Sequence, residues 1–182
     1  MTEKKVSIRY AKAIFEVAKE REILERCYND MVFVKNIINS HRELRVILKS
    51  PVINKIKKKA ILDNLFKQQI HEMTFNFFDL LTDKQREALI VDVIDQYIEL
   101  YYNEMKIQIV DITSANELTD TLKQKITAKL TEITGKTIKP NYSINTDIKG
   151  GLLLKMDNWV YDATIARQLH LLKEQLIINA KF

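Results

Sequence analysis

Two adjacent glycines near the end of the chain, Gly150 and Gly151, most constrain what it can fold into. The whole sequence of 182 residues holds only three glycines. A chain this poor in glycine uses the residue where the backbone needs a positive φ angle or a close approach by another segment. The pair directly precedes the apolar run Leu152–Leu154. We therefore predict a turn that leads into a buried strand.

The residues after this run predict a β-hairpin followed by a helix. Asp157 and Asn158 interrupt the run, and both residue types tolerate the left-handed conformation that a two-residue hairpin loop requires. Trp159–Tyr161 then supplies bulky residues that favour a strand. We interpret Asp162 as a hydrogen-bonding residue at the corner between strand and helix. Trp159 is predicted to be a packing anchor under the final helix.

Composition indicates a soluble globular protein of one domain or two small ones. Apolar residues make up 46% of the chain and charged residues 29%, an ordinary balance for such proteins. No run of roughly 18 apolar residues occurs, so no transmembrane helix is expected. The basic N-terminus leads into an amphipathic pattern that contains Glu16 and Glu20. We therefore predict neither a secretory signal nor a transit peptide.

No arrangement of residues predicts catalysis, a cofactor or a metal site. The single cysteine, Cys27, cannot form an internal disulfide and is interpreted as a small core or boundary residue. The glycine pair is not followed by Lys-Ser/Thr, so it does not predict a phosphate-binding loop. The three histidines lack the spacing of zinc ligands: His41, His71 and His170.

The first 105 residues predict helices only, with Ser40 and Pro51 between two pairs of them. The predicted helices lie near residues 5–20, 22–39, 42–49, 54–67, 70–81 and 83–104. The fold class is therefore mainly α, with an N-terminal six-helix bundle over residues 1–105. A small C-terminal α/β domain over residues 106–182 follows it.

A change of period after Met105 predicts this second domain. Residues 107–112 predict a strand, 113–118 a loop, and Thr119 the N-cap of a helix that ends at Gly135. Residues 137–144 predict another strand, and Pro140 within it favours an edge position. The final helix carries a narrow apolar seam that suits packing on the sheet or in a coiled coil: Ile165, Leu169, Leu172 and Leu176.

Two of the predicted helices, 5–20 and 83–104, carry unusually wide apolar surfaces. Each apolar arc spans roughly 200°, about twice what one core-facing stripe needs. One interpretation is that both are central helices, covered by their neighbours. The other is a shared groove that accepts an amphipathic helix from a partner. The candidate partner-binding residues are Tyr10, Ala13, Ile14, Val17, Leu89, Val93, Tyr97 and Leu100.

The net charge of +5 is unevenly distributed. Residues 42–67 contain eight basic and two acidic residues, whereas 72–104 contain two basic and eight acidic. This dipolar pattern favours charge-matched protein contacts over one basic face for nucleic acid. The run Lys55–Lys59 leaves an alternative open, a helical protein that binds nucleic acid or acidic lipid. A single short run is more often a solvated helix face.

Four motifs in order resemble the delta subunit of F-type ATP synthase, called OSCP in mitochondria. The most specific motif consists of an acidic residue, the glycine pair, an apolar strand, a two-residue turn and Asp-x-Ser/Thr. Its residues here are Asp147, Gly150, Gly151, Leu152–Met156, Asp157-Asn158, Asp162 and Thr164. The family usually has Gly-Asp at the turn and serine at position 164. The other three are Arg9–Phe15, with one residue fewer between Arg9 and Tyr10, Leu80–Arg86, and Val110–Ala115 with Leu118-Thr119.

The resemblance implies a non-catalytic stator subunit of the peripheral stalk, which couples rotation to ATP synthesis and proton transport. It implies that residues 1–105 bind the N-terminal helices of alpha subunits, with the groove in helices 5–20 and 83–104. Residues 106–182 would bind the b subunits. No cofactor and no direct nucleic-acid contact are implied, and the membrane is reached only through the complex. The expected location is the cytoplasmic face of a bacterial cell membrane, or alternatively the stromal face of a plastid membrane.

Overall fold

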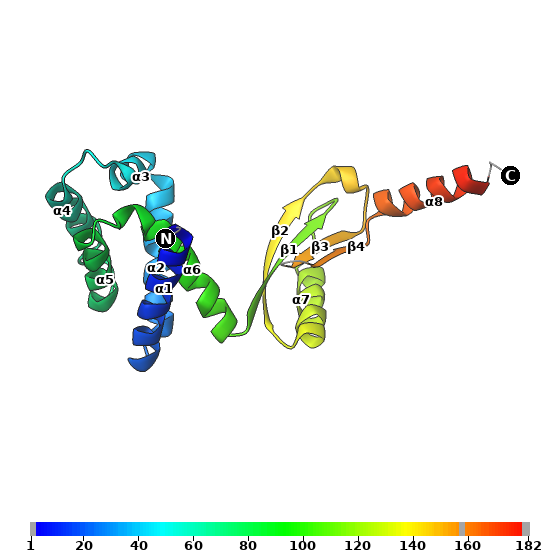
Figure 1. Ribbon diagram of the computed structural model, residues 1–182. Helices are drawn as coiled ribbons and strands as arrows, with labels where there is room; N and C mark the ends of the chain where they lie inside the picture. Colours follow the sequence, from blue (N-terminus) through cyan, green and yellow to red (C-terminus); the bar gives the residue numbers. More distant parts are fainter. Residues whose placement is uncertain (1–2, 157–158, 180–182) are drawn as a thin grey trace. The chain divides into compact units, whose positions relative to one another are not determined.

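The computed structural model describes residues 3–156 and 159–179, and the chain divides into two compact units, Met1–Glu104 and Met105–Phe182 (Figure 1). The boundary predicted from the sequence lies one residue further on. The first unit is helical, and the second contains a four-stranded sheet with two helices. The prediction of a mainly helical chain with a small C-terminal α/β part is confirmed.

The first unit is built around the contact of its first and last helices. Its elements are α1 (Glu3–Glu20), α2 (Leu24–Ser40), α3 (Arg42–Lys49), α4 (Lys55–Phe66), α5 (Glu72–Asp83), the 3₁₀ turn η1 (Glu87–Leu89) and α6 (Ile90–Glu104). Phe15 of α1 packs edge to face on the buried Tyr97 of α6. The predicted start of the last helix at residue 83 is wrong. Gln85 has a φ of 56°, and this left-handed residue ends α5 before η1 leads into α6.

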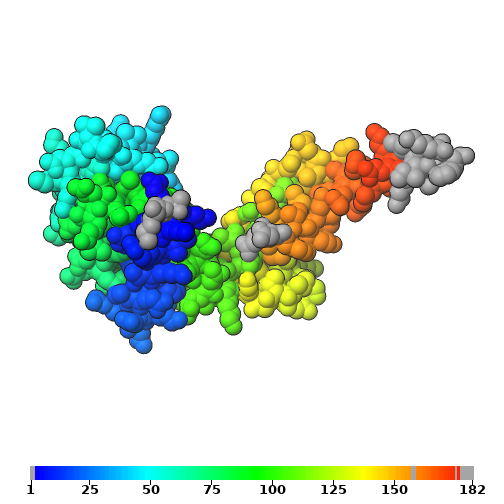
Figure 2. Space-filling view, viewed as in Figure 1, coloured from blue at the N-terminus to red at the C-terminus, as the bar shows by residue number. Residues whose placement is uncertain are grey.

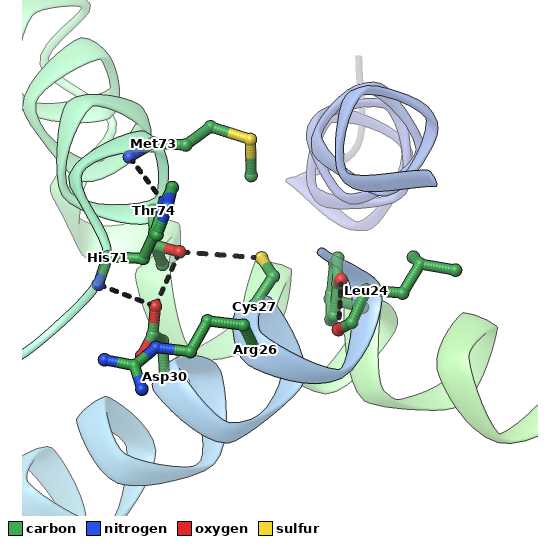
Figure 3. Close-up of polar contacts among 8 residues, drawn as sticks. Leu24, Arg26, Cys27, Asp30, His71, Met73 and Thr74 are labelled. Atoms are coloured by element: carbon green, nitrogen blue, oxygen red, sulfur yellow. Dashed lines mark hydrogen bonds and ion pairs between the residues drawn. The ribbon is translucent and has the colours of Figure 1, made fainter. Parts of the chain in front are cut away.

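A buried carboxylate joins α2 to the start of α5 (Figure 3). One oxygen of Asp30 accepts hydrogen bonds from the backbone N–H of His71 and the hydroxyl of Thr74, both at 2.9 Å. Cys27 lies beside this pair and is fully buried, as predicted, and burial raises the pKa of its thiol. Because a helix start leaves N–H groups unpaired, Asp30 fixes where α5 begins against α2.

The lysine run of α4 forms ion pairs within the unit. Lys55 pairs with Asp83 at 2.8 Å, Lys59 with Asp79 at 2.7 Å, and Lys58 with Glu87 at 2.6 Å. The last pair is buried, and the Lys58 ammonium also donates to the Leu48 carbonyl at 3.1 Å. Three of the four lysines therefore hold α4 against α5 and η1. The lysine run that suggested nucleic-acid binding is thus used mainly for ion pairs inside the unit.

The second unit is a mixed sheet in the order β2-β1-β3-β4. Its elements are β1 (Ile107–Ser114), α7 (Asp120–Thr134), β2 (Thr137–Ile144), the 3₁₀ turn η2 (Thr146–Ile148), β3 (Leu152–Met156), β4 (Trp159–Asp162) and α8 (Ile165–Asn179). The α7 crossover makes β1 and β2 parallel, and the other pairs are antiparallel. Thr113 and Ser114 belong to the strand and not to the predicted loop, because both pair with β2 and β3.

One helix covers the core of this unit. The core contains Val110, Ile112, Leu130, Ile138 and Leu154. Leu154 is the only buried member of the run 152–154, so the prediction of a buried strand holds for that residue alone. Helix α7 begins after Thr119 as predicted, without a side-chain cap, and ends at Gly135 with a φ of 64°.

The strand β2 lies at an edge of the sheet, as Pro140 predicted. Thr137 and Asn145 both donate their backbone N–H to β1 and its flanks. Because strand residues alternate, the N–H at position 140 would point away from β1, where proline removes it. The missing donor therefore interrupts the open edge at a position where pairing with another chain would otherwise be possible.

One prediction near the end of the chain is wrong, and so is one of two alternatives given for the final helix. Trp159 does not pack under the final helix: it is 49% exposed and stacks on Tyr161, with ring centroids 5.7 Å apart. The seam of α8 does not pack on the sheet, since its four predicted members are all exposed. Figure 1 shows α8 leading away from the strands. The predicted turn at Asp157-Asn158 lies outside the described residues.

Candidate partner-binding surfaces

The eight residues predicted to bind a partner helix fall into two groups. Four of them are buried in the first unit and contribute to its core: Ile14, Leu89, Val93 and Tyr97. The other four reach the surface, with Tyr10 and Leu100 half-buried and Ala13 and Val17 exposed. Burial raises the pKa of the Tyr97 hydroxyl, which donates to the Leu24 carbonyl at 3.3 Å. The predicted residues of η1 and α6 therefore lie mainly in the core of the unit. Those that reach the surface come mainly from α1.

The exposed flank of α1 meets α5 through one aromatic contact, which the sequence patterns did not indicate. Tyr10, Ala13 and Val17 lie three and four residues apart and so share one face of α1. The ring of Tyr10 meets Phe77 of α5 edge to face, with centroids 6.4 Å apart. Leu80, one turn along α5, is exposed. Phe77 and Leu80 lie three residues apart in the sequence, but this spacing is the same as in any core-facing stripe. The sequence alone therefore does not single them out.

The glycine pair forms a tight corner at the root of α8. Gly151 has a φ of 77°, and a Cβ atom there would overlap the Ala163 carbonyl oxygen. A Cβ atom at Gly150 would come within 2.6 Å of the end of the Ile165 side chain. The backbone carbonyl of Gly150 accepts from the Ile165 N–H at 3.0 Å. Glycine thus lets the turn before β3 touch the first residues of α8.

Asp162 and Thr164 complete this corner as predicted. The Asp162 carboxylate accepts from the Thr164 N–H at 3.0 Å, and the buried Thr164 hydroxyl accepts from the Arg167 N–H at 3.2 Å. The second bond satisfies an otherwise unpaired donor in the first turn of α8. Hydrogen bonds from Thr164 lower the pKa of the Asp162 carboxyl. The corner therefore fixes the direction in which α8 leaves the sheet.

Beyond this corner, the second unit exposes a large apolar surface. Leu169, Leu172 and Leu176 of α8 are exposed at helical spacing, and so are Trp159 and Tyr161 of β4. Figure 2 shows the orange and red atoms of α8 standing clear of the rest of their unit. An exposed apolar helical surface of this kind is typical of a protein-binding site.

Within the described ranges, no cluster of three or more His, Cys, Asp or Glu side chains could hold a metal ion. No described helix is both long and apolar enough to cross a membrane. The main candidate feature for binding is an exposed apolar helical surface on each unit. Surfaces of this kind define a protein that binds other proteins.

Comparison with known proteins gives the family. The sequence pattern of the ATP synthase delta (OSCP) subunit matches residues 6–176. The chain is 33% identical over 171 residues to ATP synthase subunit delta of Pelodictyon phaeoclathratiforme, covering 94% of this chain and 96% of the relative. It is 34% identical over 174 residues to ATP synthase subunit delta of Alkaliphilus metalliredigens, with coverage of 94% and 96%.

A solved structure shares the fold. A chain in the cryo-EM structure of the Toxoplasma gondii mitochondrial ATP synthase hexamer matches with a TM-score of 0.69 at 22% identity, covering 94% of this chain and 97% of that one. The chain described here belongs to the ATP synthase delta (OSCP) subunit family. It is a structural subunit of the peripheral stalk, and its partners are other ATP synthase subunits.

Proposed function

We propose that the first unit, a six-helix bundle, binds the N-terminal helices of alpha subunits, and that the second unit binds the b subunits. The chain then holds the catalytic head against rotation and has no active site of its own. It works at the cytoplasmic face of a bacterial membrane, which it reaches through the complex. The observation that carries this proposal is an exposed apolar helical surface on each unit.

For the alpha subunit, we place the partner helix along the exposed flank of α1. Tyr10, Ala13 and Val17 present apolar atoms on one face. The buried Phe77 of α5 supports the ring of Tyr10, and Leu80 adds exposed apolar surface on α5. Of the α6 residues predicted from the sequence, Leu100 is the member with accessible side-chain surface. Val93 and Tyr97 support the site by holding α6 against α1. An amphipathic helix lying in such a groove buries residues at three- and four-residue spacing.

For the b subunits, the seam of α8 supports the proposal. Leu169, Leu172 and Leu176 repeat at three and four residues, the spacing of a coiled-coil seam. The b subunits would supply the facing helices. The cap at Thr164 and the glycine corner hold the first turn of α8 in place, so the seam is presented in a fixed direction.

Binding to the alpha subunit is tested by calorimetry with a synthetic peptide of the alpha N-terminal segment. Val17→Asp is expected to weaken binding at least about tenfold, or ~1.4 kcal/mol, because it buries a charge without a partner. Leu65→Asp is the matched control, since Leu65 is 39% exposed and Val17 38%. Val93→Asp is unsuitable, because Val93 is buried and the variant is expected to unfold the unit.

Wild-type binding should show a negative heat-capacity change and little dependence on salt, as expected for apolar contacts. Binding that disappears with added salt would indicate an electrostatic contact instead. If the Val17 and Leu65 variants bind alike while both remain folded, the partner helix does not lie on the α1 flank.

A further inference from the structure

The most exposed large apolar side chains described in the first unit lie together in the sequence. Val46 is 58% exposed, Ile56 73% and Val52 90%. A single exposed aliphatic residue is ordinary. Here three fall within eleven residues, and basic residues lie between them. In Figure 2 this segment, in cyan, lies at the surface of the unit.

The first of these residues, Val46, belongs to α3 and lines a hollow in the surface. A hollow of about 450 Å³ is lined by Arg42, Arg45, Val46, Lys49 and Ser50. The first four of these residues are spaced by three, one and three positions, so they share one face of the helix. The buried Leu44 and Leu48 lie on the opposite face. The exposed face is therefore an apolar floor with a cation on several sides, here called the α3 hollow.

The cations of the α3 hollow have no acidic partner among the described residues, in contrast to the paired lysines of α4. No described carboxylate forms an ion pair with Arg42, Arg45 or Lys49. The Arg45 guanidinium instead donates to the side-chain oxygen of Asn39 at 2.9 Å, which holds it in position. Glu43 is exposed and lies about 60° round the helix from Val46, as Lys49 does on the other side. Three cations thus face one carboxylate around Val46, and the local charge is positive.

We propose that the α3 hollow binds an acidic helical segment of a partner protein. An apolar side chain of that segment packs on Val46, and carboxylates on either side of it pair with Arg42, Arg45 and Lys49. Arginine held in one orientation suits a carboxylate, since its fork can donate two parallel hydrogen bonds. The hollow shares no residue with the α1 flank, so this inference does not depend on the proposed function.

The test uses the full chain and two labelled helical probe peptides. One carries Glu on both sides of a leucine stripe, and the other has Gln at the same positions. Fluorescence anisotropy is expected to show the Glu peptide binding at least about tenfold more tightly than the Gln peptide, with affinity that falls as salt rises. Arg45→Glu and, separately, Lys49→Glu are expected to reduce binding of the Glu peptide at least about tenfold.

Lys67→Glu is the matched control, because Lys67 is also an exposed cation without an acidic partner among the described residues. It should change binding less than about twofold. Circular dichroism checks that each variant is folded. The proposal is overturned if the Glu peptide does not bind, if the control weakens binding as much as the variants do, or if the chain binds phosphatidylserine vesicles through Arg45 and Lys49 and ignores both peptides.

Discussion

Replacing Gly151 with alanine should damage the second unit far more than an ordinary glycine substitution. A φ of 77° costs alanine about 1–2 kcal/mol. The new Cβ atom would also overlap the Ala163 carbonyl, so the backbone must move and weaken the bond from the Ala163 N–H to Leu152, worth about 1 kcal/mol. The expected loss is about 2–3 kcal/mol, or roughly 8–24 °C in melting temperature for a unit of this size.

The sequence offers both a reporter and a control for this experiment. Trp159, the only tryptophan, lies in β4, so its fluorescence follows unfolding of the second unit. Gly135 has a φ of 64°, but a Cβ atom there would meet nothing within 4 Å. Gly135→Ala should therefore cost only the backbone term, about 1 kcal/mol. Equal losses for the two variants would refute the role of the close approach at the corner.

Two further predictions concern charged groups. Glu87→Gln should destabilise the first unit by about 3–5 kcal/mol in urea melts, because it leaves the Lys58 ammonium buried without its charged partner. Replacing both residues, with Lys58→Met and Glu87→Leu, should recover much of that loss. A Glu87→Gln variant as stable as the double variant would contradict this reasoning. The lowered pKa of Asp162 means that its stabilising effect is present above about pH 4 and is lost as the pH falls through the folded-state value. Melts followed by Trp159 fluorescence should thus lose stability in acid, and Asp162→Asn should be less sensitive to acid than wild type; identical acid profiles would exclude Asp162 as a contributor.

Local backbone chemistry made the turns, the helix end and the edge strand of the second unit predictable. Glycine at 150 and 151, proline at 140 and glycine at 135 each restrict the backbone in a way that tertiary contacts rarely override. The corner at Asp162 and Thr164 followed from the same reasoning, because both side chains bond to N–H groups close to them in the sequence.

What the sequence could not give was the direction each wide apolar surface faces. The apolar stripe that includes Val93 and Tyr97 is equally consistent with a buried core face and with an exposed binding groove. Only the packing of α6 against α1 decides between these two interpretations. Trp159 was misplaced for the same reason: a large aromatic residue is usually buried, but the single helix α7 does not cover β4. The pairing of Lys55, Lys58 and Lys59 depends on residues more than 19 positions away.

A bridging experiment tests most directly that the chain links head to stalk. The C-terminal segment of a b subunit is fixed to a surface, and capture of the catalytic head is measured by surface plasmon resonance with and without the purified chain. The head should be retained only when the chain is present. Val17→Asp should keep the b contact and lose the head, whereas Leu172→Asp should lose the b contact. Retention of the head without the chain, or full bridging by both variants, would contradict the account.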